Sequence, residues 1–156
     1  MRYEYTETQN VSCRLICTGR NSFAALYENK KEKKGIGVAV MHSDSNYMTF
    51  SAGIELAERG FTVLCGAPDS SSPLMMKMMA VKGMVDFLYS LPEISKVYLF
   101  GHSGGATLMT AYQNAAENGA GVFAGPEKVV QFPDKMPGPP GRGGGPVAFT
   151  PADGVM

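Results

Sequence analysis

The sequence has few of the residues with which small proteins bind metals, form disulfides or attract nucleic acids. It holds three cysteines and two histidines among 156 residues, and its 14 basic residues balance 14 acidic ones. Cys13, Cys17 and Cys65 form no C-x-x-C pair, which argues against a zinc site and favours buried free thiols. The lack of net charge argues against binding to nucleic acid or to an anionic membrane surface.

Long apolar runs are also missing. No run reaches the length of a membrane-spanning helix, and the polar residues 1–10 do not resemble a signal peptide. Hydrophobic residues nevertheless make up 44% of the chain and charged residues 18%, which is enough for one domain with a core. We therefore expect a soluble, cytoplasmic protein with no metal or cofactor and no nucleic-acid or membrane partner.

Strand-like and helix-like segments alternate through the first 118 residues. We expect strands at 11–18, 22–28, 35–41, 61–65 and 96–100, and helices at about 49–59, 73–91 and 104–117. The first two strands suggest a hairpin. This order predicts an α/β fold with a mostly parallel, doubly wound sheet that begins with a β-hairpin.

The last part of the chain has a different composition. Residues 133–146 include five prolines and five glycines, a composition that cannot form a core. We therefore divide the chain into an incomplete core at 1–130, a flexible Pro/Gly-rich segment at 131–150, and the beginning of a truncated strand at 151–156.

The most informative motif lies between the 96–100 strand and the helix after it. It reads Gly101-His102-Ser103-Gly104-Gly105, a Gly-x-Ser-x-Gly sequence. A strand-to-helix turn this tight needs very small neighbours, and it presents the serine hydroxyl beside the free N–H groups of the helix N-terminus. The context predicts a nucleophile elbow with Ser103 as the nucleophile.

Over residues 11–120 the chain resembles the N-terminal part of an α/β-hydrolase, with an elbow of the kind common in that family's esterases and thioesterases. The resemblance rests on the hairpin, the strand that ends in Met41-His42-Ser43-Asp44, and the elbow at 101–105. It implies that Ser103 attacks carboxylic or thio-esters of small molecules. It also implies that Gly104 supplies one oxyanion-hole N–H, and that the loop after the 35–41 strand supplies the second from Asp44, or alternatively from Ser43.

The chain departs from this family where the rest of the catalytic triad should be. The family places an acid and then a histidine after the serine, and this sequence has no histidine after His102. The later carboxylates, which come too early in the fold for the usual acid, are Glu117, Glu127, Asp134 and Asp153. His42 is left as a possible base or as a brace of the oxyanion loop. Because serine without a base is a weak nucleophile, we expect an incomplete hydrolase, truncated around the sixth strand, with little activity alone.

Two other interpretations remain. The chain could be a non-catalytic remnant that serves as a binding or oligomerisation module through an exposed sheet edge. The 101–105 turn could also cradle a phosphate at the helix N-terminus. Neither the G-x-G-x-x-G pattern nor the P-loop pattern is present to support the second of these.

Overall fold

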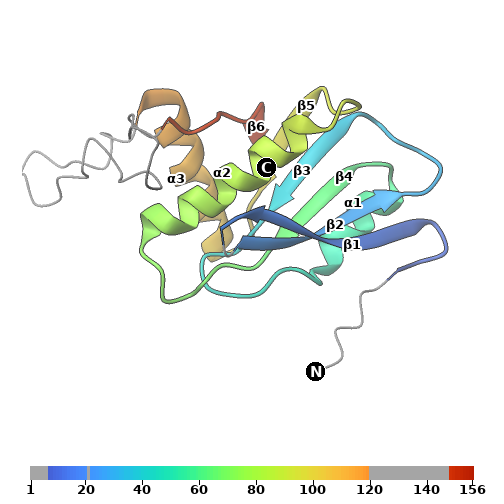
Figure 1. The fold of residues 1–156 in the computed structure, drawn as a ribbon, viewed down its shortest axis with the longest axis horizontal. Coiled ribbons are helices and arrows are strands. Elements are labelled where there is room, and N and C mark those ends of the chain that lie inside the picture. The colour runs from blue at the N-terminus through green and yellow to red at the C-terminus, as the bar shows by residue number, and fades with distance from the viewer. Residues whose placement is uncertain (1–6, 21, 120–147) are drawn as a thin grey trace, which may run out of the picture.

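Residues 7–20, 22–119 and 148–156 are described by a computed structural model, shown in Figure 1. In chain order the elements are β1 (Val11–Gly19), β2 (Ser22–Asn29), β3 (Ile36–Val40), α1 (Ser51–Glu58), β4 (Thr62–Gly66), α2 (Leu74–Ser90), β5 (Lys96–Phe100), α3 (Gly104–Asn118) and β6 (Gly154–Val155). The strands and helices predicted from the sequence are all present up to α3, and their ends differ from the prediction by at most two residues.

The strands form one six-stranded sheet in the order β1-β2-β4-β3-β5-β6. β2 is antiparallel to both β1 and β4, whereas β4, β3, β5 and β6 pair in parallel. The fold class predicted from the sequence is therefore confirmed. From β3 the chain moves to β4 on one side and then to β5 on the other, and ligands of open α/β sheets bind beside such a switch, outside the carboxyl ends of the strands.

Helices cover both faces of this sheet. Alternate residues of each central strand belong to different cores, so that Ala39 packs in one and Val38 in the other. The first core includes Met78 of α2 and Tyr112 of α3, and the second includes Ala57 of α1. In Figure 1, α2 lies across the side of the sheet that faces the viewer. Among the described helices, none combines the length and apolar character needed to cross a membrane.

Residues 148–156 are held against α2, α3 and β5 by a group of polar side chains that we call the C-terminal clasp: Tyr89, Tyr112, Gln113 and Asp153. The Gln113 amide donates to the carbonyl oxygen of Ala152 at 2.9 Å and accepts from its N–H at 3.0 Å. The Tyr112 hydroxyl donates to the carbonyl oxygen of Thr150 at 2.7 Å. Phe149 and Ala152 are buried in the core shared with α2 and α3.

The clasp bears on the division of the chain expected from the sequence. β6 falls within the 151–156 range. Phe149 was assigned to the flexible Pro/Gly-rich segment, yet it packs edge-on against Tyr112, with ring centroids 5.4 Å apart. Residues 131–147 of that segment, and residues 1–6, 21 and 120–130 of the expected core, lie outside the described residues.

The three cysteines are free, but the prediction that all of them are buried is wrong. Only Cys65 is buried; Cys13 is half-buried and Cys17 is exposed. The difference follows from position, because Cys65 lies in a central strand and the other two lie in the edge strand β1. Burial raises the pKa of the Cys65 thiol to about 12, so this group stays protonated at neutral pH.

Candidate active site

The turn between β5 and α3, residues 101–105, contains a strained backbone conformation. We call it the serine turn. Ser103 has φ 54° and ψ −125°, and it is the one non-glycine residue with a positive φ within the described ranges. Such a conformation costs of order 1–3 kcal/mol and persists only where the surroundings enforce it. Two bonds close the turn, from Gly105 N–H to His102 O at 2.9 Å and from Ala106 N–H to Ser103 O at 3.0 Å.

The Ser103 hydroxyl is not used to hold the helix. Serine at this position commonly caps a helix by accepting a backbone N–H. Ser103 occupies the N-cap position of α3 but makes no side-chain cap hydrogen bond, and the residue is exposed. Ser103 therefore lies exposed at the N-terminus of α3 with its hydroxyl not used as a helix cap.

Gly101 lets the chain turn back on itself. A Cβ at this position would overlap the Cα of Ala106 and would lie 2.7 Å from its nitrogen. The Gly101 N–H donates to the carbonyl oxygen of Met156 at 3.1 Å, which ties the start of the turn to the segment that contains β6.

Gly104 and Gly105 allow the serine turn to lie directly against the loop that follows β3. A Cβ on Gly104 would overlap the hydroxyl of Ser43 and lie 3.1 Å from Nε2 of His42. A Cβ on Gly105 would lie 2.7 Å from the carbonyl oxygen of Met41. The structure thus brings the predicted site residues of the two loops into contact.

His42 braces its own loop. Its Nδ1 accepts hydrogen bonds from the backbone N–H groups of Asp44 and Ser45, both at 3.0 Å. A ring nitrogen that accepts two such bonds carries no proton, so the proton of the neutral ring lies on Nε2. Nε2 is the nitrogen on the side of Gly104. These contacts favour the brace role over the base role, because a protonated Nε2 cannot accept a proton from Ser103.

The same bonds bear on the second oxyanion-hole donor. The Asp44 N–H, which we favoured from the sequence, is directed at the His42 ring in this structure. The Ser43 N–H remains the alternative donor.

An ion pair fixes the side chain of Asp44. Oδ1 accepts a hydrogen bond from Lys77 Nζ at 3.1 Å, and Oδ2 accepts one from the Ser43 hydroxyl at 2.7 Å. The bonds from Ser43 and then from Lys77 hold the pKa of this carboxyl below its ordinary value. Only 11% of the Lys77 side chain is exposed. The sequence analysis missed Lys77, although a single lysine among the methionines at the start of α2 was a visible signal.

A second residue that the sequence analysis missed is Tyr47. Its hydroxyl lies 2.9 Å from Nδ1 of His102, the residue before the predicted nucleophile. The Tyr47 ring stacks on Phe50, with centroids 4.4 Å apart, and lies 5.0 Å from the ring of His42. An aromatic residue within an otherwise polar loop was the available signal.

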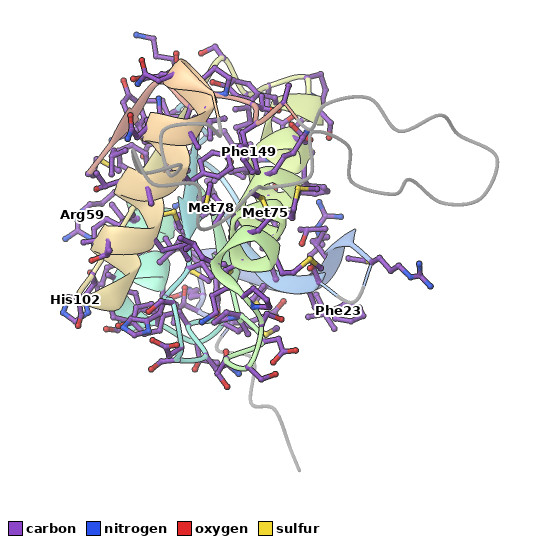
Figure 2. The ribbon with its side chains drawn as sticks, turned by 90° about the vertical axis from the view of Figure 1, so that its left-hand side faces the viewer. Phe23, Arg59, Met75, Met78, His102 and Phe149 are labelled. Carbon is purple, nitrogen blue, oxygen red and sulfur yellow. The ribbon has the colours of Figure 1, made fainter. Side chains whose placement is uncertain are left out.

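Neither of the late carboxylates that the structure describes lies at the serine turn. Asp153 accepts from Val97 N–H at 2.7 Å and from the Tyr89 hydroxyl at 2.8 Å, near the start of β5. Glu117 accepts from Gln113 near the end of α3. Figure 2 shows His102 at the lower end of α3, well apart from Phe149 of the 148–156 segment. Glu127 and Asp134 lie outside the described residues. In the described ranges, no three histidine, cysteine or carboxylate side chains are grouped as metal ligands.

Comparison with known proteins supports the fold. No family model and no curated protein matches the chain. Among solved structures, esterase B from Lactobacillus rhamnosis matches 74% of this chain and 43% of its own, with a TM-score of 0.60 and 15% identity. A bacterial heroin esterase matches 74% and 42%, with a TM-score of 0.58 and 15% identity.

A dienelactone hydrolase-like phosphotriesterase, P91, from metagenomic libraries matches 69% of this chain and 55% of its own, with a TM-score of 0.52 and 14% identity. The chain thus spans less than half the length of the two esterases. At identities this low, the similarity shows a shared fold and does not show a shared activity. The described part of this chain has an α/β-hydrolase fold.

Proposed function

We propose that this chain carries the nucleophile and oxyanion-binding half of a serine hydrolase that cleaves carboxylic or thio-esters of small molecules. The observation that carries the proposal is the strained conformation of Ser103, whose hydroxyl makes no cap bond at the N-terminus of α3. Strained backbone of this kind gathers at functional sites, where it places a side chain for reaction.

The residues of the two loops have separate roles in the proposed reaction. The Ser103 oxygen attacks the ester carbonyl carbon, and its proton passes to a base. The carbonyl oxygen, now negative, accepts hydrogen bonds from Gly104 N–H and from the N–H of Ser43 or Asp44. The bond to the leaving alcohol or thiol then breaks, the proton passes to that group, and an acyl-enzyme remains for water to cleave.

The base of this reaction is not assigned to any residue described here. Nδ1 of His42 accepts two backbone hydrogen bonds, and Nδ1 of His102 is hydrogen-bonded to the Tyr47 hydroxyl. Because the chain spans about 43% of the length of the esterase that it resembles, we propose that the base and its acid come from polypeptide beyond the described residues. The chain alone should therefore react slowly, and a small external base should speed it.

The substrate class is proposed from the printed names of two fold neighbours. Esterase B was crystallised with a tributyrin phosphonate inhibitor, and EstE5, which matches 74% of this chain at 11% identity, was soaked with p-nitrophenyl butyrate. Both compounds carry short acyl chains. Short-chain esters and phosphonates are thus the first probes for this chain.

The test is phosphonylation of the folded 156-residue chain by a fluorophosphonate, measured by intact mass with and without imidazole as an external base. We expect one adduct that maps to Ser103, whose rate of formation rises with imidazole concentration. Ser103→Ala should abolish it. Ser45→Ala, which removes an exposed hydroxyl from the neighbouring loop, should leave it unchanged. A folded chain that shows no Ser103 adduct at any imidazole concentration would contradict the proposal.

A binding or oligomerisation role is the second candidate, and the outer end of the sheet favours it. Within the described residues the strand order ends at β6, where 39% of Val155 and 52% of Met156 are exposed. Apolar residues on an open edge can pair with another chain. We would measure the molar mass by light scattering and repeat it with Val155→Lys. A concentration-independent monomer would count against this role.

A further inference from the structure

Tyr47 connects the two loops of the candidate site. His102 precedes the proposed nucleophile, and His42 braces the loop that holds the proposed second oxyanion donor. The Tyr47 hydroxyl lies 2.9 Å from Nδ1 of His102, and the Tyr47 ring lies 5.0 Å from the His42 ring at a tilt of 34°. One side chain therefore contacts a histidine in each of the two loops that would supply the oxyanion donors.

Tyr47 is itself held in place from two sides. Its backbone N–H donates to the carbonyl oxygen of Gly66 at 3.3 Å, which fixes it to the end of β4. Its ring stacks on Phe50 at 4.4 Å, and the Phe50 N–H donates to the Tyr47 carbonyl oxygen at 3.0 Å. The Phe50 ring also lies 5.8 Å from the ring of His102. The hydroxyl thus reaches His102 from a fixed position.

The place of His102 determines how easily the serine turn can relax. Its carbonyl oxygen accepts the Gly105 N–H at 2.9 Å, and its side chain is bound to Tyr47. The next residue, Ser103, has the strained backbone, which would relax if its surroundings did not hold it. A tether on the His102 ring opposes the rotation by which the turn would relax.

We propose that Tyr47 is a positioning residue: its hydroxyl holds His102 and thereby keeps the Ser103 hydroxyl and the Gly104 N–H in register with the β3 loop. This proposal rests on the function proposed above for Ser103. The contrary view is that Tyr47 only packs in an aromatic cluster. The variant Tyr47→Phe separates the two views, because it keeps the ring that packs and removes the hydroxyl that binds His102.

The variants are Tyr47→Phe, His102→Gln and the double substitution, all in the full chain. The matched control is Tyr27→Phe. The Tyr27 hydroxyl donates to the carbonyl oxygen of Met48 at 2.6 Å, so its loss removes a bond to the same loop without removing the bond to His102. Thermal unfolding of each variant shows that it is folded before it is compared.

The first measurement is amide hydrogen exchange by NMR, which needs no reactive serine. The Gly105 and Ala106 amides report on the serine turn through their bonds to His102 and Ser103, and Tyr112 reports on the middle of α3. Loss of one hydrogen bond should speed exchange at Gly105 and Ala106 by roughly three- to tenfold and leave Tyr112 unchanged. His102→Gln should give an increase of similar size, and the double variant should add nothing further.

The second measurement is the rate of Ser103 phosphonylation at saturating imidazole. Tyr47→Phe should slow it by roughly three- to tenfold, and Tyr27→Phe should not. Unchanged exchange at Gly105 and Ala106 in Tyr47→Phe, or an equal change in Tyr27→Phe, would overturn the positioning role. If the exchange changes as expected while wild type is never phosphonylated, the tether stands and the proposed hydrolase function fails.

Discussion

The serine turn follows the end of β5, whereas the C-terminal clasp binds the start of β5 and the middle of α3, and both contain polar side chains. In the clasp, Tyr112, Gln113 and Asp153 each bind a particular backbone group, as Gln113 does with both the N–H and the carbonyl oxygen of Ala152, and Tyr89 binds the carboxylate of Asp153. At the serine turn, the backbone of Ser103 is strained and its hydroxyl makes no cap bond. Polar clusters that look alike in a sequence can therefore serve stability in one place and chemistry in another.

The largest predicted effect comes from a substitution that adds one methyl group to the serine turn. Gly101→Ala should lower the free energy of unfolding by about 3 kcal/mol, because the new Cβ would overlap the backbone of Ala106. Gly19→Ala is the matched control: its Cβ would have as its nearest neighbour the Cβ of Ser22, at 3.8 Å. Urea unfolding of the three proteins measures the difference, and equal losses for both variants would show that the serine turn has no special constraint.

The second-largest predicted effect is the loss of stability when a hydrogen bond of the C-terminal clasp is removed. Asp153→Ala leaves the buried N–H of Val97 without its acceptor, which should cost about 2 kcal/mol of stability. Ser103 phosphonylation of the folded variant should keep its wild-type rate, because Asp153 binds near the start of β5 and the serine turn follows the end of that strand. Asp153→Asn retains an acceptor oxygen and should lose less. A large fall in the phosphonylation rate of folded Asp153→Ala would mean that the two regions are coupled.

A smaller effect has the opposite sign. Ser103→Gly should raise the free energy of unfolding by about 1 kcal/mol, because glycine adopts this backbone conformation without strain, although it gives the unfolded chain more freedom. The same variant should lose all phosphonylation at this position. If Ser103→Gly instead lowers the free energy of unfolding, the backbone of Ser103 is not strained in solution.

The smallest effect is on the pH dependence of stability. Bonds from Val97 N–H and from Tyr89 hold the pKa of Asp153 below its ordinary value of about 3.9. A carboxyl whose folded pKa is lowered stabilises the fold above the unfolded pKa, and this contribution disappears as pH falls through the folded pKa. The urea midpoint should therefore fall between pH 5 and pH 3, and less so in Asp153→Asn. Equal falls in both proteins would remove Asp153 as a cause.

The sequence predicted the fold through signals that are local in the chain. Apolar periodicity located the strands and helices, and the alternation of β3 to α3 with one hairpin before it predicted a mixed sheet. The serine motif was equally visible, because its spacing and its place between strand and helix are both contained in a few residues.

The remaining parts of the site depend on contacts between distant residues. Tyr47 and His102 are 55 positions apart, and Asp44 and Lys77 are 33 apart, so no local pattern joins them. The orientation of the Asp44 N–H toward the His42 ring depends on the path of one loop. The packing of Phe149 against Tyr112 is a contact of the same kind, since composition alone does not reveal it.

The most direct test of the central claim is a crystal structure of the phosphonylated chain. The account predicts phosphorus bonded to the Ser103 oxygen, and a phosphonyl oxygen that accepts hydrogen bonds from Gly104 N–H and from the N–H of Ser43 or Asp44. A phosphonyl oxygen that points into solvent without a bond to Gly104, or an adduct on another residue, would contradict it.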